Sequence, residues 1–203
     1  MITLTVFALG AALIAGLLLY AHSRPDHAAV ARSILIQAPP QKIFPFIEDL
    51  RLMGAWSPFE QLDPTVKRSF SGVARGTGAV YEWDGNGKLG AGRMEIIDSS
   101  PAARVIVELD FFRPIKADGI AEFSLRPVQG GTELRWEMDG RRPFLVKLIG
   151  LFLVLEEING RAFEQGLASL KALVEEPRQP QGYWSGAGAG AVNASRLSAS
   201  RAA

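Results

Sequence analysis

An unbroken apolar segment opens the chain. Residues 2–21 contain no charged side chain, and at about 1.5 Å per residue a helix of this length matches a hydrocarbon core of about 30 Å. We interpret residues 1–22 as a single transmembrane anchor and residues 23–29 as the linker that follows it. The alternative is a cleaved signal peptide, but such peptides have a basic start and a shorter apolar stretch, and no Lys or Arg precedes this segment.

The charges beside this segment favour one side of the membrane. Arg24 and Arg32 follow it, whereas only the α-amino group precedes it. Because cytoplasmic flanks carry an excess of Lys and Arg, we expect a single-pass membrane protein whose domain lies in the cytoplasm. Export after signal cleavage is the alternative.

Alternating apolar and polar residues dominate the middle of the chain. The clearest case is residues 131–140, where Leu134, Trp136 and Met138 share one face and charged side chains occupy the other. Such alternation is typical of a strand with one buried and one solvated face. Recurrent Gly, Pro, Asn and Asp turn signals delimit the strands, which we expect near residues 66–72, 78–84, 88–98, 103–113, 116–127 and 131–140. Because their connections are short, neighbouring strands are expected to run antiparallel.

Other patterns flank these strands. Before them we expect a short strand at residues 33–37, a short helix within residues 38–50 that Pro45 kinks, and a second short helix within residues 51–62. After them, the apolar positions favour one long helix over residues 144–175. Most of its faces are apolar at its start, and a single apolar stripe continues to its end.

Composition excludes several classes of protein. The chain has 22 Lys and Arg against 21 Asp and Glu, so no broad basic surface would recruit nucleic acid. It has no Cys, and its two His, His22 and His27, lie beside the apolar segment. This absence excludes Ser-His, Cys-His and His-metal centres from the domain that follows. Residues 177–203 are rich in Gly, Ala and Ser, which is typical of a disordered low-complexity tail.

Four blocks of sequence resemble a known superfamily: WSPFEQLDP (56–64), GVARGTGAVYEWDGNGKLGAGRMEI (72–96), FFRPIKADGIAEFSLRP (111–127) and FEQGLASLKALVE (163–175). They are similar to the START-like superfamily, specifically to bacterial SRPBCC proteins of the polyketide cyclase/dehydrase-like type. The resemblance implies an α+β helix-grip fold for residues 30–176. In that fold a curved antiparallel sheet, here of about seven strands, surrounds a long C-terminal helix. Two short helices would follow the first strand, and one transmembrane helix would precede the domain.

The resemblance also implies a cavity between the sheet and the long helix that holds an apolar ligand. Candidate lining side chains come from the strand faces, an early loop that would close one end, and the long helix: Trp56, Phe59, Tyr81, Trp83, Met94, Leu109, Phe111, Phe123, Trp136, Met138, Phe152 and Leu155. The plainer alternative is that these side chains fill the core, as aromatic and Met residues at strand period usually do.

Little on the inner face of the predicted sheet could carry out acid or base chemistry. Tyr81 is the one titratable side chain that alternation places inward, and its ordinary pKa of about 10 suits hydrogen bonding better than proton transfer. Asp63 precedes Pro64, which is normally turn chemistry. We therefore assign no catalytic residue, no metal site and no cofactor.

Three functions stay open. The first is a membrane-tethered binding domain for a lipid or another apolar small molecule. The alternative is an enzyme of the polyketide cyclase or aromatase kind, which needs a polar cluster inside the cavity. The second alternative is a protein-interaction domain whose core is filled by its own side chains, so that no pocket is left.

The start of the predicted long helix suggests a further contact with the membrane. Arg141 and Arg142 directly precede it, and Leu145, Ile149 and Leu153 fall on the side away from the sheet. Basic residues beside an apolar helix face are typical of segments that lie on anionic bilayers. We expect these residues to contact the membrane beside the mouth of the cavity.

Overall fold

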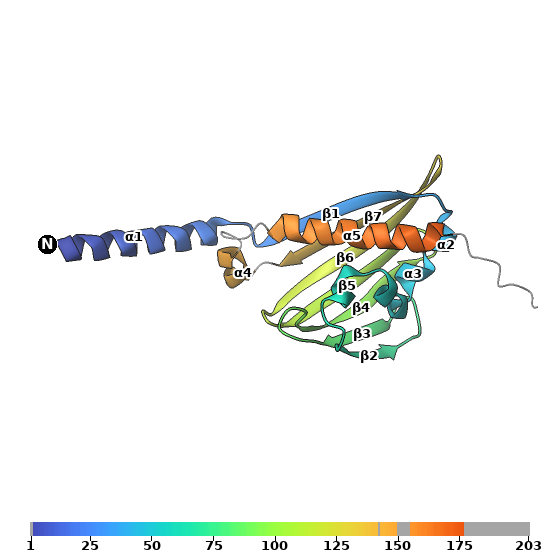
Figure 1. The fold of residues 1–203 in the computed structure, drawn as a ribbon, viewed down its shortest axis with the longest axis horizontal. Coiled ribbons are helices and arrows are strands. Elements are labelled where there is room, and N and C mark those ends of the chain that lie inside the picture. Colours follow the sequence, from blue (N-terminus) through green and yellow to red (C-terminus); the bar gives the residue numbers. More distant parts are fainter. Residues whose placement is uncertain (1, 142, 150–154, 177–203) are drawn as a thin grey trace, which may run out of the picture.

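A curved antiparallel sheet organises the domain (Figure 1). The computed structural model of the protein describes residues 2–141, 143–149 and 155–176, without the side chains of residues 2, 149 and 155–159. The sheet has seven strands in the order β1-β7-β6-β5-β4-β3-β2. Their bounds are β1 (His27–Ile36), β2 (Lys67–Gly72), β3 (Ala79–Asp84), β4 (Ala91–Ser100), β5 (Arg104–Arg113), β6 (Ala117–Val128) and β7 (Gly131–Arg141).

The strands from β2 to β7 follow one another along the chain and across the sheet, which confirms the six strands predicted from alternation and turn signals. The predicted first strand, residues 33–37, is too short. β1 begins at His27 and pairs with β7 along its whole length, from His27 opposite Arg141 to Ile36 opposite Thr132. Its first half is rich in Ala and carries little alternation, so the pairing partner rather than the local pattern determines where this strand starts.

Two prolines divide the segment between β1 and β2. The single kinked helix predicted within residues 38–50 is two one-turn helices, α2 (Pro40–Ile43) and α3 (Pro45–Glu48), because Pro45 has no N–H to continue a helix. The helix predicted within residues 51–62 is two 3-10 helices, η1 (Leu50–Ala55) and η2 (Pro58–Gln61). Ser57 precedes Pro58 and is extended, as the residue before a proline prefers.

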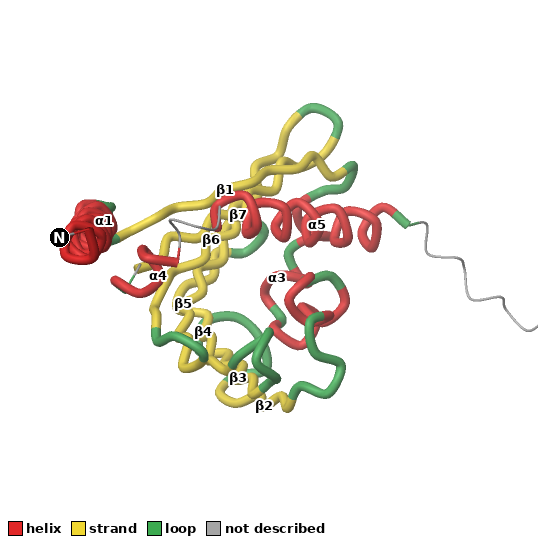
Figure 2. Tube along the Cα trace, turned by 60° about the vertical axis from the view of Figure 1, so that its left-hand side comes forward, coloured by secondary structure: helices red, strands yellow, loops and turns green. Residues whose placement is uncertain are grey.

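The helix α5 (Leu155–Glu175) crosses the concave face of the sheet (Figures 1 and 2). Its stripe of Phe163, Leu167 and Leu170 is buried. Irregular pairing of β4 with β5 at two points locally bends and twists the sheet, as bulges do. Alternate residues of the strands are buried on the same face, among them Tyr81, Trp83, Val105, Val107, Ala121, Phe123, Leu125, Leu134 and Trp136. The predicted helix-grip fold is confirmed.

The apolar run at residues 144–149 is not the first part of α5. It forms a separate short helix, α4 (Phe144–Ile149), which contacts α1 (Ile2–Ser23) and points in a different direction from α5 in both views (Figures 1 and 2). The prediction of one helix over residues 144–175 is therefore wrong. A helix that is apolar on most faces needs cover on more than one side, and α1 offers a second apolar surface that the sheet does not.

The helix α1 projects away from the domain (Figure 1), and most of its side chains are exposed. Residues 3–23 are long and apolar enough to cross a membrane, a property that a signal sequence near the N-terminus shares. Between α1 and β1 lie only residues 24–26.

Candidate functional site

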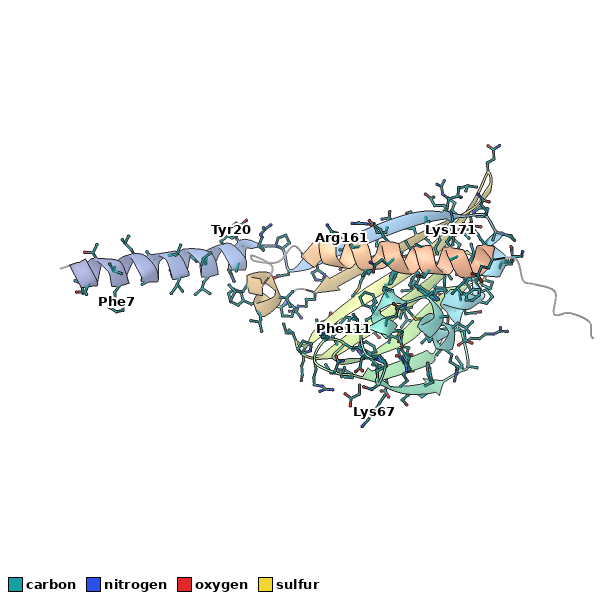
Figure 3. All side chains as sticks on the ribbon, viewed as in Figure 1. Phe7, Tyr20, Lys67, Phe111, Arg161 and Lys171 are labelled. Carbon is teal, nitrogen blue, oxygen red and sulfur yellow. The ribbon has the colours of Figure 1, made fainter. Side chains whose placement is uncertain are left out.

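A cavity of about 480 Å³ lies between the concave face of the sheet and the segments that cover it. This volume falls within the range of ligand pockets, about 300–1,000 Å³. Nine of the predicted lining residues line it: Phe59, Tyr81, Trp83, Met94, Leu109, Phe111, Phe123, Trp136 and Met138. In Figure 3 the side chain of Phe111 lies on the part of the domain nearer to α1.

Three predicted lining residues are not among these nine. Trp56 is fully buried behind the pocket, where its indole Nε1 donates a hydrogen bond to the carbonyl of Phe46 at 2.9 Å. Its ring packs edge-on against Trp136, with centroids 5.6 Å apart. Trp56 is thus a core residue that supports the lining. Phe152 and the side chain of Leu155 lie outside the described residues.

An aromatic stack forms one wall of the pocket. The ring of Trp136 lies parallel to that of Phe163, with centroids 4.0 Å apart and an interplanar angle of 6°. The ring of Phe123 packs against Trp136 at a tilt of 31°, with centroids 5.1 Å apart. Phe163 belongs to the stripe of α5 that periodicity identified, although that pattern alone did not mark it as a lining residue. Gly166 lets α5 approach this closely, because a Cβ there would lie 3.1 Å from the Trp136 ring and 2.9 Å from Cδ of Pro58.

One polar cluster lines the mostly apolar pocket. The hydroxyl of Tyr81 donates to Oε1 of Glu60 at 2.6 Å, and Arg68 donates to Oε2 of Glu60 at 2.8 Å. Both Tyr81 and Glu60 line the cavity. Burial, together with the Glu60 carboxylate, raises the pKa of Tyr81 well above its ordinary value, so its hydroxyl stays protonated.

Glu60 could not be placed from the sequence. It lies on the short 3-10 helix η2. Such a helix has neither the two-residue repeat of a strand nor the 3.6-residue repeat of an α-helix, so its inward positions cannot be counted from the sequence. Its partner Tyr81 was expected to face inward and does so. The polar cluster that we did not expect in the cavity is therefore present.

Asp63 holds a turn and does not line the cavity. Its carboxylate is buried and accepts hydrogen bonds from the backbone N–H and hydroxyl of Thr65, at 2.9 and 2.7 Å, and from the N–H of Asn86 at 2.7 Å. These bonds lower the pKa of Asp63. They connect the loop before β2 to the β3–β4 turn, so the turn role expected for Asp63 is confirmed.

The exposed side chains around the cavity indicate where it opens. Leu62 and Lys88 line it and are themselves exposed, and Leu89 beside them is half-buried. These residues lie after η2 and in the β3–β4 turn. Among the described residues, no group of three or more His, Asp or Glu side chains could hold a metal ion.

The predicted membrane-contact residues are only partly described. Arg141 ends β7 and is exposed, and Leu145 lies on α4 with an exposed side chain. Arg142, Leu153 and the side chain of Ile149 lie outside the described residues.

Comparison with known proteins identifies the domain. A family model described as "Polyketide cyclase / dehydrase and lipid transport" matches residues 27–175. No curated protein matches the chain.

Several solved structures share the fold. Protein CV1439 from Chromobacterium violaceum has 19% identity and a TM-score of 0.51, over 76% of this chain and 100% of that one. The Aha1 dimer from Colwellia psychrerythraea has 17% identity and a TM-score of 0.53, over 75% and 99%. The di-domain ARO/CYC StfQ from the steffimycin biosynthetic pathway has 10% identity and a TM-score of 0.55, over 74% of this chain and 51% of that one. At these identities the likeness extends to the fold alone.

Proposed function

The chain belongs to the polyketide cyclase / dehydrase and lipid transport family, and on this basis we propose that residues 30–176 form a membrane-tethered binding domain for a lipid or another apolar small molecule. The cavity of about 480 Å³ carries this proposal. Its lining is mostly aromatic and aliphatic, and burying apolar ligand surface against such side chains contributes about 25 cal/mol per Å².

The polar cluster indicates a ligand with one polar group. Both carboxylate oxygens of Glu60 already accept hydrogen bonds from Tyr81 and Arg68. The Tyr81 oxygen can still accept one bond, since a phenol is both donor and acceptor. A ligand hydroxyl that donates to Tyr81, with an apolar body against the aromatic wall, would satisfy this arrangement.

The same cluster supports a second function, a polyketide cyclase or aromatase-like enzyme, because a carboxylate and a phenol inside a cavity are possible acid and base groups. Two observations favour binding over catalysis. The raised pKa of Tyr81 makes it a poor acid, and both carboxylate oxygens of Glu60 are already bonded, one to Tyr81 and one to Arg68. The other alternative, a protein-interaction domain with a filled core, is disfavoured by the volume of the cavity.

We further propose that α1 is retained as a membrane anchor with the domain on the cytoplasmic side. Arg24 directly follows α1, as the positive-inside rule requires of a cytoplasmic flank. Arg32 adds less to this preference than its position suggested, because it lies on β1 and pairs with Glu164 at 2.7 Å. Signal cleavage followed by export is the alternative.

Two measurements together test the binding function. One is native mass spectrometry of the full chain released from detergent micelles, and the other is extraction of the molecules that co-purify with it. We expect a bound apolar molecule with the wild type and its loss from Leu109→Trp, in which a larger ring occupies the pocket. Ile120→Trp is the matched control, since Ile120 is on the outer face of the sheet and exposed. The proposal fails if a correctly folded Leu109→Trp retains as much of the molecule as Ile120→Trp, or if the wild type carries none and takes up none from a lipid extract.

A further inference from the structure

The position of α4 relates the domain to the bilayer. α4 contacts α1, and Ala21, near the end of this mostly exposed helix, is fully buried. Lys147 on α4 is buried as well and forms an ion pair with Asp26, in the three-residue connection between α1 and β1. α4 is therefore held level with the last turn of α1, where a spanning helix leaves the hydrocarbon core for the headgroups.

Large apolar side chains are exposed at this end of the domain. Phe144 and Leu145 on α4 are 45% and 52% exposed, and Phe112 at the end of β5 is 49% exposed. The register places Phe112 at the same end of the sheet, because Phe111 is opposite Ala117 and His27, where β1 begins, is opposite Arg141. Figure 1 shows this end of the sheet facing the side from which α1 projects.

A shallow groove lies between Phe112 and the residue that precedes α4. It has a volume of about 510 Å³, and Phe112 of the β5–β6 hairpin and Pro143, directly before α4, both line it. Lys116 and Arg141 also line the groove, as do Asp110 and Asp118. The two cations and two carboxylates balance, so the groove has no net charge with which to select anionic lipid.

We propose that this end of the domain rests on the bilayer surface, with Phe144, Leu145 and Phe112 inserted among the lipid headgroups. The bilayer is the partner because α1, the helix that would cross it, packs against α4, which carries Phe144 and Leu145 of this surface. Apolar insertion rather than charge drives the contact, so docking occurs on zwitterionic lipid and responds weakly to salt. The proposal requires α1 to span the membrane and is independent of what the cavity binds.

The absence of Cys from the chain allows a direct test with single-Cys variants of the full protein in phosphatidylcholine vesicles. A fluorophore at Leu145→Cys or Phe112→Cys should be quenched by a spin label on the lipid headgroup and protected from aqueous iodide. Val73→Cys is the matched control. Val73 is 49% exposed but follows β2 at the opposite end of the sheet, so its fluorophore should be quenched by iodide alone.

A label at Leu13→Cys in α1 reports whether the helix is inserted. Loss of lipid quenching at position 112 is expected when Phe144→Glu and Leu145→Glu are combined, and no loss is expected from Val73→Glu. The proposal is overturned if the labels at 145 and 112 respond to the two quenchers as the label at 73 does. It is also overturned if the label at 13, in the middle of the apolar helix, is not quenched by a spin label on the lipid acyl chain, because α1 then does not span. An empty cavity would change neither outcome.

Discussion

At the scale of single residues, the pairing of Tyr81 with Glu60 distinguishes this pocket from a purely apolar one. The bond is 2.6 Å long and has a charged acceptor. Hydrogen bonds to charged groups typically contribute about 1.5–3 kcal/mol. We expect the lower part of this range, because Arg68 still neutralises Glu60 when the phenol is gone.

Tyr81→Phe should accordingly lower the free energy of unfolding by about 1.5 kcal/mol, measured by chemical denaturation of the full chain in detergent. In a Glu60→Gln background the acceptor is neutral, so the same change should cost less. The difference between the two costs is the coupling energy of the pair. Equal costs in both backgrounds would show that the charge of Glu60 adds nothing to the bond.

Asp63 gives the domain a dependence on pH. Its pKa is lowered by the hydrogen bonds from Thr65 and Asn86. A lowered folded-state pKa stabilises the fold fully above the unfolded value of about 3.9, and this stabilisation disappears as the pH falls through the folded pKa. Asp63→Asn should therefore melt at a lower temperature than wild type at pH 7. The difference between the two melting temperatures should narrow below about pH 4. A difference that stays constant as the pH falls would contradict the lowered pKa of Asp63.

At the scale of elements, the close approach of α5 to the sheet depends on Gly166. Replacing glycine by alanine within a helix normally stabilises it by about 1 kcal/mol. Here the added Cβ would lie 2.9 Å from a rigid proline ring and 3.1 Å from Trp136, and overpacking costs about 1–3 kcal/mol. We expect Gly166→Ala to destabilise the domain in thermal unfolding, whereas Gln165→Ala on the exposed side of the same helix should be neutral. A more stable Gly166→Ala would mean that α5 can shift away from the sheet.

Most of the pocket could be predicted because strands have a strict period. Counting every second residue placed Trp83, Leu109 and Met138 inward, and all three line the cavity. Irregular segments have no regular repeat. For this reason Glu60 was not predicted to line the cavity, and Trp56 was predicted to line it but lies in the core. The start of β1 depends on its pairing with β7, and the separation of α4 from α5 depends on the packing of α4 against α1. Neither of these contacts can be recognised from the local sequence pattern.

At the scale of the whole molecule, the proposed anchor predicts an intact chain in the membrane fraction. The full sequence has a mass of 22.0 kDa, and a signal peptidase would shorten it by the apolar segment. Intact-mass measurement of the protein from native membranes should give the full-length value. A shorter protein found in the soluble fraction would support the exported alternative and remove the membrane anchor from the proposal.

The short connection between α1 and β1 limits how far the domain can move. An extended residue spans at most about 3.6 Å, so residues 24–26 reach about 11 Å. A carrier that shuttles its cargo between two membranes needs a tether as long as the gap between them. If α1 is embedded as we propose, the domain stays beside a single leaflet. A ligand of the kind we propose would then have to be taken up and released there, to that leaflet or to a partner that comes to it.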